Sequence, residues 1–280
     1  MKKLKILLFI ILMSLSINVY AIEFDLNSQH AILYNLNDNS ILYEKSSKDK
    51  TSIASMTKIM TGIVAIENIE NLDNKVKLTY ADFAGLAEAN AAVAGFRIGE
   101  EVTYKDLLYG LMLPSGNDSA IAIAEQVSGS VEKFVELMNE EARKLGATNT
   151  HFVNPHGYHD KEHYTTAYDL YLMLNACIKD ERFIDIISSK KWSTVITQKD
   201  GSTRAVTWNQ SNRFINGNRE TPHGITMIGG KTGTTYEAGY CLTQYGKDSK
   251  DTPYISMIMG ATSSRNLYDN MTFLWAAIPD

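Results

Sequence analysis

Three short clusters of residues in this chain have the types and spacing that acyl-transfer chemistry requires. Breaking an amide bond by acyl transfer needs a nucleophile, a base, an oxyanion site and an acid for the leaving amine. A Ser and a Lys three residues apart on a helix share one face, so the amine can reach the hydroxyl. The clusters are Ser55 with Lys58, Ser115 with Asn117, and the run Lys231, Thr232 and Gly233.

The context of the first cluster distinguishes it from chance occurrences. The same Ser-x-x-Lys spacing occurs at 47–50 and at 188–191, in charged stretches. Ser55 instead lies at the start of an apolar helical pattern that predicts a helix over 52–68, with Ser52 as its N-cap. The hydroxyl and the amine of the first cluster are therefore expected on one face of a buried helix.

The second and third clusters lie in segments that can border a substrate. Ser115 follows Pro114, which stops a helical pattern, and opens a loop that contains Gly116. The third cluster lies between the glycines at 229–230 and Gly239, which would let a substrate backbone approach closely. A phosphate-binding loop is the alternative for this glycine-rich stretch, but it has one residue too many before the lysine.

A zinc site is the alternative mechanism that the histidines raise. Four of the 6 histidines fall within 151–163, and His159 and His163 have the i, i+4 spacing of metal ligands on a helix. However, no His-Glu-x-x-His is present, and the run from Asn154 to Gly157 contains helix-breaking residues. We therefore expect a loop there, no metal ion and no other cofactor.

The composition excludes several classes of protein. The 280 residues carry 27 Lys and Arg against 32 Asp and Glu, a net charge of −5 without a basic cluster, which argues against a nucleic-acid partner. A hydrophobic fraction of 44% is enough for a sizeable core. The two cysteines, Cys177 and Cys241, cannot form a disulfide scaffold, and we expect both to pack as small apolar groups rather than pair.

The first residues have the pattern of a secretory signal peptide over 1–21. A lysine-rich segment at 2–5 precedes an almost wholly apolar run at 6–17, and a small residue stands at Ala21. A retained membrane anchor is the alternative, but the run is about 12 residues long and a spanning helix needs about 20. We expect cleavage after Ala21, which would leave 22–280 to work outside the cytoplasm.

The hydrophobic periodicity predicts an α+β fold. We expect one antiparallel sheet built from both chain ends and flanked by helices, with an all-helical subdomain inserted over roughly 68–190. Strands are predicted over 32–36, 41–43, 192–197, 204–208, 226–232, 240–245 and 254–260. Helices are predicted over 52–68, 104–113, 118–127, 131–145, 166–178 and 264–277.

Taken together, the three clusters resemble the active site of the penicillin-binding proteins and serine β-lactamases, whose motifs are S-x-x-K, S-x-N or S-D-N, and K-T-G. Their flanking residues are similar to those of the low-molecular-mass D-alanyl-D-alanine carboxypeptidases over nearly the whole mature chain. The segments that carry this resemblance lie at 54–61, 114–118, 154–157, 166–170 and 231–240.

The sequence departs from the subgroup pattern at two places. Ile53 stands where a Pro is common, and the small β domain that many members append has no counterpart after Asp280. The amphipathic membrane anchor that follows that domain has no counterpart either. We therefore expect no stable membrane anchor once the signal peptide has been cleaved.

Five side chains would carry the chemistry in a serine mechanism of this kind. Ser55 would be the nucleophile and Lys58 its base, held neutral by burial and by the positive charge of Lys231. Ser115 would pass a proton to the departing D-alanine while Lys231 polarises it. The Asn117 amide would hold Lys58 and the substrate backbone.

The remaining binding roles are those that the resemblance implies. It implies that the backbone N–H groups of Ser55 and Thr234 are the oxyanion donors, one of them near a helix start where the amide is unpaired. The free carboxylate of the leaving D-alanine could accept hydrogen bonds from Thr232 and Thr234. Arg213 and Arg265 are implied as its cationic partners, with a surface charge or a structural ion pair as the alternative for each.

We therefore interpret the sequence as a secreted, cofactor-free serine D,D-carboxypeptidase that removes the terminal D-alanine from peptidoglycan pentapeptides and that β-lactams would inhibit covalently. A serine β-lactamase is the first alternative, but no Glu-x-x-Leu-Asn follows the second motif to activate water, and the nearest segment, 136–139, comes too early. A non-catalytic protein that binds peptidoglycan or another partner is the second, and the intact motifs argue against it.

Overall fold

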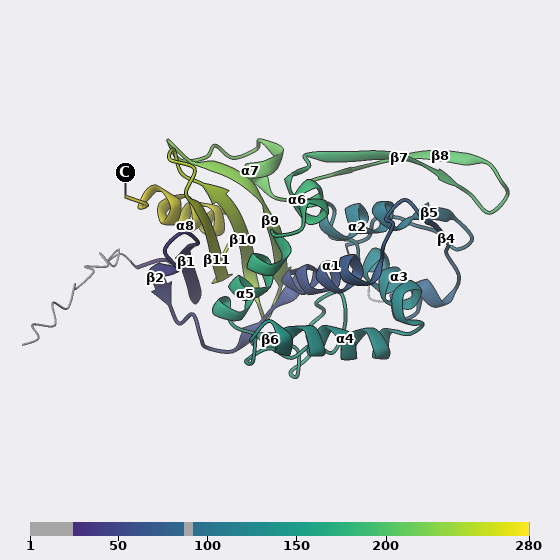
Figure 1. The fold of residues 1–280 in the computed structure, drawn as a ribbon, viewed down its shortest axis with the longest axis horizontal. Coiled ribbons are helices and arrows are strands. Elements are labelled where there is room, and N and C mark those ends of the chain that lie inside the picture. Colours follow the sequence, from purple (N-terminus) through teal and green to yellow (C-terminus); the bar gives the residue numbers. More distant parts are fainter. Residues whose placement is uncertain (1–24, 87–91, 280) are drawn as a thin grey trace, which may run out of the picture.

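The computed structural model describes residues 25–86 and 92–279, so the predicted signal peptide at 1–21 lies outside the described residues. One antiparallel sheet is covered by helices on both faces, and a mainly helical part lies beside it (Figure 1). The predicted α+β class, with a sheet assembled from both ends of the chain, is confirmed.

The main sheet has the strand order β2-β1-β11-β10-β9. The N-terminal hairpin joins the C-terminal strands because β1 pairs with β11, with His30 opposite Met259. Strand β9 lies at the edge and pairs only with β10 among the described strands. The five strands are β1 (His30–Asn35), β2 (Ser40–Lys45), β9 (Thr226–Thr235), β10 (Gly239–Lys247) and β11 (Pro253–Ala261).

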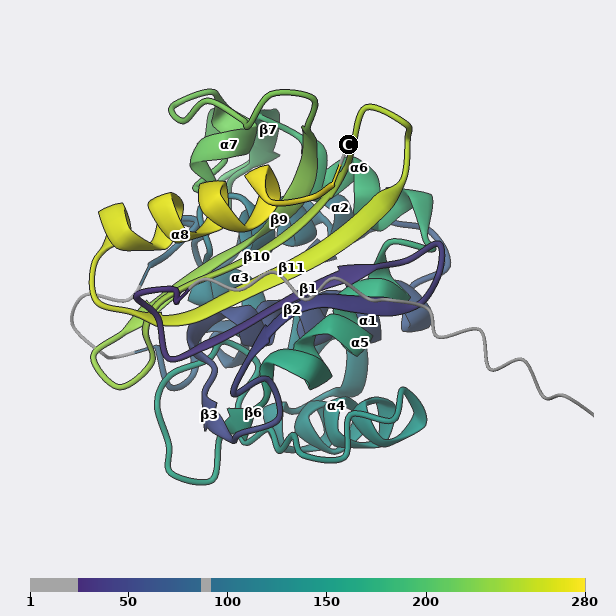
Figure 2. The same ribbon diagram turned by 90° about the vertical axis from the view of Figure 1, so that its left-hand side faces the viewer.

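Each face of the main sheet buries its own hydrophobic cluster. Helix α8 (Ser264–Ala276) covers one face, and Figure 2 shows it lying across the strands. Its Trp275 is fully buried and donates from Nε1 to Ser256 Oγ at 2.7 Å. The other face packs against helix α5 (Ala167–Cys177) and the helical part. The sheet is therefore fixed from both sides.

Helix α1 (Thr57–Asn68) forms the centre of the helical part, and its residues 57–66 are all buried. Other helices surround it because apolar residues cover most of its circumference. No helix of the described chain is both long enough and apolar enough to cross a membrane. The surrounding helices are α2 (Tyr104–Met112), α3 (Asn117–Ser128), α4 (Val131–Lys144), α5 and α6 (Glu181–Ser188), with short helices η2 (Ala81–Phe83) and α7 (Arg213–Asn216) elsewhere.

The strands predicted at 192–197 and 204–208 do not join the main sheet. They form the hairpin of β7 (Lys191–Thr197) and β8 (Thr203–Asn209), which belongs to a separate sheet of order β4-β5-β7-β8. The expectation of a single sheet is therefore wrong, and strands β4 and β5, which lie within 68–190, make the inserted part mainly rather than wholly helical. Period-two alternation indicates a strand but not its partner. The remaining strands are β4 (Lys75–Lys77), β5 (Glu101–Thr103), and the pair β3 (Thr51–Ser52) and β6 (Tyr164–Thr165).

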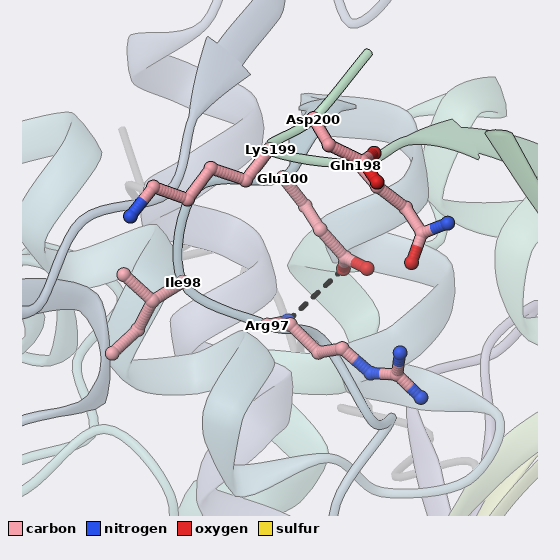
Figure 3. Close-up of a pocket in the computed structure, with 6 residues that line it drawn as sticks. All are labelled: Arg97, Ile98, Glu100, Gln198, Lys199 and Asp200. Carbon is pink, nitrogen blue, oxygen red and sulfur yellow. Dashed lines mark hydrogen bonds between the residues drawn. The ribbon is translucent and has the colours of Figure 1, made fainter. Parts of the chain in front are cut away.

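The turn of the β7–β8 hairpin packs on the segment that precedes β5. Figure 3 shows the pocket between them, lined by residues 97, 98 and 100 on one side and 198–200 on the other. A side chain on Gly99 would collide with Lys199, because a Cβ there would lie 2.8 Å from the Lys199 Cβ. The hairpin thus rests directly on the backbone of this segment.

One helix begins later than predicted, and another was not predicted. Helix α1 begins at Thr57 rather than at Ser52, because a short 3-10 helix, η1 (Ala54–Met56), precedes it. Ala54 has a left-handed φ of +51°, which is incompatible with a continuous α-helix. Helix α6 was not predicted.

Candidate active site

Ser55 and Lys58 lie one helical turn apart at the junction of η1 and α1. Lys58 Nζ is 3.1 Å from Ser55 Oγ. The Ser55 side chain is partly exposed, whereas Lys58 has no exposed surface. A reactant can therefore reach the hydroxyl while the amine stays out of water.

The other two contacts of the Lys58 amine are with oxygen atoms that can only accept hydrogen bonds. Lys58 Nζ lies 2.7 Å from Asn117 Oδ1 and 2.7 Å from the backbone oxygen of His156. Asn117 is the first residue of α3, and its own N–H donates to Ala92 O at 2.8 Å. Two of the directions around the nitrogen are thus fixed, and the third points to Ser55.

Ser115 and Lys231 form a second hydroxyl–amine pair. Lys231 Nζ lies 2.8 Å from Ser115 Oγ and donates to Thr232 O at 2.7 Å. Ser115 stands between α2 and α3 with a left-handed φ of +66°, which is rare for a residue other than glycine. Lys231 is 1% exposed and projects from β9. The pair therefore joins the helical part to the edge of the main sheet.

Both lysines have pKa values below those of an exposed amine. Burial lowers the pKa of Lys231 to about 7. Burial also lowers the pKa of Lys58 well below its usual value, and the positive charge of Lys231 lowers it further, while the Asp118 carboxylate acts in the opposite direction. The shared cause is that a charged amine loses hydration when it is buried.

Strand β9 passes close to the Ser55 backbone at Gly233. A Cβ on Gly233 would lie 3.1 Å from Ser55 N, so a larger residue would press on the nucleophile segment. Thr232 Oγ1 contacts Ser211 Oγ at 2.8 Å, and the exposed Thr234 donates from Oγ1 to Gly233 O at 2.8 Å. The structure therefore brings the three sequence clusters together at one edge of the sheet.

The two predicted carboxylate partners make their contacts with α8 instead of with this cluster. The Arg213 guanidinium lies over the Tyr268 ring, 5.2 Å from its centroid. Arg265 Nε is 3.7 Å from Asp269 Oδ2, and the Arg265 side chain is 88% exposed. Both side chains would have to change their present contacts to bind a ligand at Lys231.

The predicted alternatives for the histidines and cysteines can be compared with the structure. Residues 158–163 contain no helix, as expected, and His159 contacts Ser52 Oγ at 3.3 Å. Among the described residues, no three His, Cys, Asp or Glu side chains come together as metal ligands would. Cys177 and Cys241 are both free and buried, which confirms that prediction.

Three contributors to the cluster were assigned no role from the sequence. His156 contributes its backbone oxygen, and a carbonyl leaves no signature in the residue type. Asp118 accepts from the N–H groups of three consecutive residues, Ala94, Gly95 and Phe96, at 2.7, 2.8 and 3.1 Å. The third is His163, whose Nε2 lies 2.7 Å from Oγ1 of Thr57, the first residue of α1. The segments 114–118 and 154–157, which belong to the family resemblance, contain Asp118 and His156 and were the available signals.

Comparisons with known proteins agree with this geometry. The family model described as D-alanyl-D-alanine carboxypeptidase matches residues 17–263. The chain is 34% identical over 242 residues to the D-alanyl-D-alanine carboxypeptidase DacF of Bacillus subtilis (strain 168), covering 85% of this chain and 58% of that protein. It is also 34% identical over 211 residues to the D-alanyl-D-alanine carboxypeptidase of Streptomyces sp. (strain K15), covering 72% of this chain and 70% of that protein.

A solved structure extends the similarity to three dimensions. The crystal structure of the Streptomyces K15 DD-transpeptidase superposes with a TM-score of 0.83 at 30% sequence identity, covering 90% of this chain and 96% of that one. The chain spans just over half the length of the Bacillus relative. Because the family model covers most of the sequence and the fold agrees, the chain belongs to the D-alanyl-D-alanine carboxypeptidase family.

Proposed function

We propose that this protein is a serine D-Ala-D-Ala carboxypeptidase that releases the terminal D-alanine from peptidoglycan stem peptides through an acyl-enzyme on Ser55. The observation that carries the proposal is the environment of Lys58. A neutral amine has two hydrogens and one lone pair. Asn117 Oδ1 and His156 O can take the two hydrogens, which leaves the lone pair directed at the Ser55 hydroxyl.

Acylation follows from this arrangement. Ser55 Oγ attacks the carbonyl carbon of the penultimate D-alanine and gives its proton to Lys58 Nζ. The backbone N–H groups of Ser55 and Thr234 hold the resulting oxyanion. The C–N bond then breaks, and Ser115 passes a proton to the departing amine. Lys231 stabilises the deprotonated Ser115 oxygen, since Lys231 Nζ lies 2.8 Å from Ser115 Oγ.

Hydrolysis completes the cycle. Lys58 first returns the proton it took from Ser55 to the Ser115 oxygen, which leaves the Lys58 amine neutral again. Water then attacks the Ser55 ester and gives a proton to Lys58, which passes it to the Ser55 oxygen as the shortened peptide leaves. The carboxylate of the leaving D-alanine is bound by Lys231 and by the hydroxyls of Thr232 and Thr234. Arg213 and Arg265 are proposed as its outer partners, once they leave Tyr268 and Asp269. No resident cofactor takes part in these steps.

The site of action and the inhibitors follow from the same substrate. Peptidoglycan lies outside the cytoplasm, and the N-terminal pattern at 1–21 supports export. Penicillin resembles an acyl-D-Ala-D-Ala terminus, so Ser55 would open its ring and form an ester. The amine of the opened ring stays attached, which obstructs deacylation. We therefore propose β-lactams as covalent inhibitors.

Two measurements on the purified protein test the proposal. Wild-type protein will release D-alanine from diacetyl-L-Lys-D-Ala-D-Ala, and intact-mass spectra with penicillin will show one adduct that persists for minutes. Ser55→Ala will lose both properties and keep its fold by circular dichroism, whereas the control variants Ser47→Ala and Ser188→Ala will keep both. Rapid penicillin turnover without a lasting adduct would identify a β-lactamase instead.

A further inference from the structure

A chain of three hydrogen bonds runs behind the nucleophile. The backbone N–H of Val153 donates to His163 Nδ1 at 3.0 Å, and His163 Nε2 lies 2.7 Å from Thr57 Oγ1. Thr57 Oγ1 donates in turn to the backbone oxygen of Ala54 at 2.8 Å. Thr57 and His163 are 0% and 2% exposed, so water does not compete for these bonds.

The direction of each proton in this chain is fixed by chemistry. A backbone N–H can only donate, so His163 Nδ1 accepts and carries no proton. The neutral imidazole therefore has its proton on Nε2 and donates it to the Thr57 oxygen. The hydroxyl proton of Thr57 is then directed to the Ala54 carbonyl. Each bond in such a chain polarises the next in the same sense.

His163 is held in the neutral form that this chain needs. Burial, opposed by Asp160 and aided by the neighbouring His151 and His159, lowers the pKa of His163 to about 4. At pH 7 the imidazole is thus uncharged and keeps one donor and one acceptor nitrogen. The hydrogen bonds from His163 to Thr57 and from Thr57 to Ala54 therefore keep the same direction throughout the neutral pH range.

The chain ends on the peptide unit that contains the Ser55 N–H. The carbonyl of Ala54 and the N–H of Ser55 belong to one planar amide, so fixing the oxygen also fixes the direction of the N–H. Gly157 packs against the same carbonyl, since a Cβ there would lie 2.0 Å from Ala54 O. The left-handed φ of +51° at Ala54 is a strained conformation that such surroundings must maintain.

We propose that Thr57 and His163 are positioning residues that aim the Ser55 N–H at the oxyanion of the transition state. This proposal rests on the proposed function, in which that N–H is one of the two oxyanion donors. The contribution of such a donor depends on its being aligned before the reaction begins. The backbone N–H of Thr57 also donates to Ala54 O, so removing the hydroxyl loosens the peptide unit without releasing it.

Three variants separate this role from a general role in packing. Thr57→Val removes the hydroxyl and keeps the shape, and Thr57→Ser restores the hydroxyl. Thr61→Val is the matched control, because Thr61 is equally buried one turn further along α1 and also donates to a backbone carbonyl, that of Pro155 at 2.6 Å. Thermal unfolding checks that each variant folds. His163→Phe, which keeps a ring, replaces Thr57→Val if that variant does not fold.

The readouts are steady-state kinetics and the affinity of a transition-state analogue. In a peptide boronic acid, boron replaces the reacting carbonyl carbon and forms a tetrahedral adduct on Ser55. Thr57→Val will lower kcat for D-alanine release by about tenfold to a hundredfold, with KM changed less than about threefold, because the lost interaction exists only in the transition state. The inhibition constant of the boronic acid will rise by the same factor as kcat/KM falls. Thr57→Ser and Thr61→Val will stay within about threefold of wild type in both measurements.

The outcomes distinguish the two proposals. If wild-type protein releases no D-alanine, the proposed function fails. If wild type is active and Thr57→Val matches it, or if Thr61→Val loses as much boronate affinity as Thr57→Val, the positioning role is wrong. A rise in KM with kcat unchanged would also contradict it, since that pattern belongs to ground-state binding.

Discussion

At the scale of single residues, the protonation of one buried amine decides whether the site can work. Burial and the positive charge of Lys231 lower the pKa of Lys58 well below its usual value, which favours the neutral amine that a base requires. The imidazole of His156 lies near this amine but does not compete as a base, because burial lowers the pKa of that ring to about 3. We therefore propose Lys58, rather than His156, as the group that accepts the proton of Ser55.

Lys58→Arg tests this assignment. A guanidinium remains protonated at any pH at which the protein is folded, so it cannot accept the proton of Ser55. We expect acylation by penicillin, followed by stopped-flow or by intact mass, to slow by at least about a thousandfold, while the charge of the side chain at low pH is unchanged. An arginine variant that acylates at a near-normal rate would move the role of base to Ser115 with Lys231.

At the scale of secondary-structure elements, the segment 92–96 is held between the site and the β7–β8 hairpin. On one side, Asp118 accepts from the N–H groups of residues 94, 95 and 96. On the other side, Trp208 Nε1 donates to Ala94 O at 2.7 Å and Arg204 Nη2 donates to Gly95 O at 2.8 Å. Asp118 follows Asn117 directly, so the hairpin supports the start of α3 through this segment.

Trp208→Phe and Trp192→Phe form a matched pair that tests this support. The two tryptophans are directly opposite each other on β8 and β7, and Trp192 Nε1 donates to Asp106 at 2.9 Å instead of to the segment. Trp208→Phe leaves the buried Ala94 oxygen without a donor, which costs about 1–3 kcal/mol. We expect acylation to slow by at least about threefold in Trp208→Phe and to stay unchanged in Trp192→Phe. Equal rates in the two variants would argue against the support.

Asp118→Asn should act on the pH profile as well as on the rate. The charged groups that act on the pKa of Lys58 are Lys231 from β9, which lowers it, and Asp118 from α3, which raises it; the imidazole of His156 also faces the amine, which lowers the pKa of that ring. The Asp118 carboxylate raises the pKa of Lys58, so its removal lowers that pKa further. In the pH profile of the acylation rate, the fall in rate on the acid side will then occur at lower pH. Trp208→Phe will leave the position of this fall unchanged. A fall that does not move in Asp118→Asn would show that the Asp118 charge does not act on Lys58.

The elements also show what the sequence can and cannot predict. Apolar periodicity predicted the central helices and the strands of the main sheet, because one buried face repeats along each element. The left-handed Ala54 that starts α1 late has no signal of its own, since alanine usually favours a helix. The three clusters were recognisable because their hydroxyl, amine and amide side chains stand at the start of an apolar helix, after a helix-stopping proline and within a glycine-rich stretch. The His163–Thr57 contact joins residues far apart in sequence, so only the fold could show it.

At the scale of the whole molecule, the site lowers stability at neutral pH. The pKa of Lys231 is about 7 in the folded protein, against 10.5 in an unfolded chain. Between these values the unfolded chain binds a proton that the folded protein does not, so the free energy of unfolding rises with pH. The buried thiols of Cys177 and Cys241, whose pKa values are raised by burial, act in the opposite sense.

Lys231→Met isolates the contribution of the lysine. Urea unfolding at pH 7.0, 8.0 and 9.5 should give a free energy of unfolding that rises less steeply with pH in the variant than in wild type. The buried thiols are present in both proteins, so their effect cancels in the comparison. If the two pH dependences run parallel, Lys231 has an ordinary pKa in the folded protein.

The pairing of β1 with β11 has a consequence for how the chain folds. His30 lies opposite Met259, so β1 and β11 can join only when nearly the whole chain is present, although β1 can pair with β2 and β11 with β10 before that. Contacts this distant in sequence close slowly, because a long loop must be ordered first. The central sheet therefore cannot be completed on a partly synthesised chain. Both ends of the chain must be available before the sheet is complete, whatever has already folded between them.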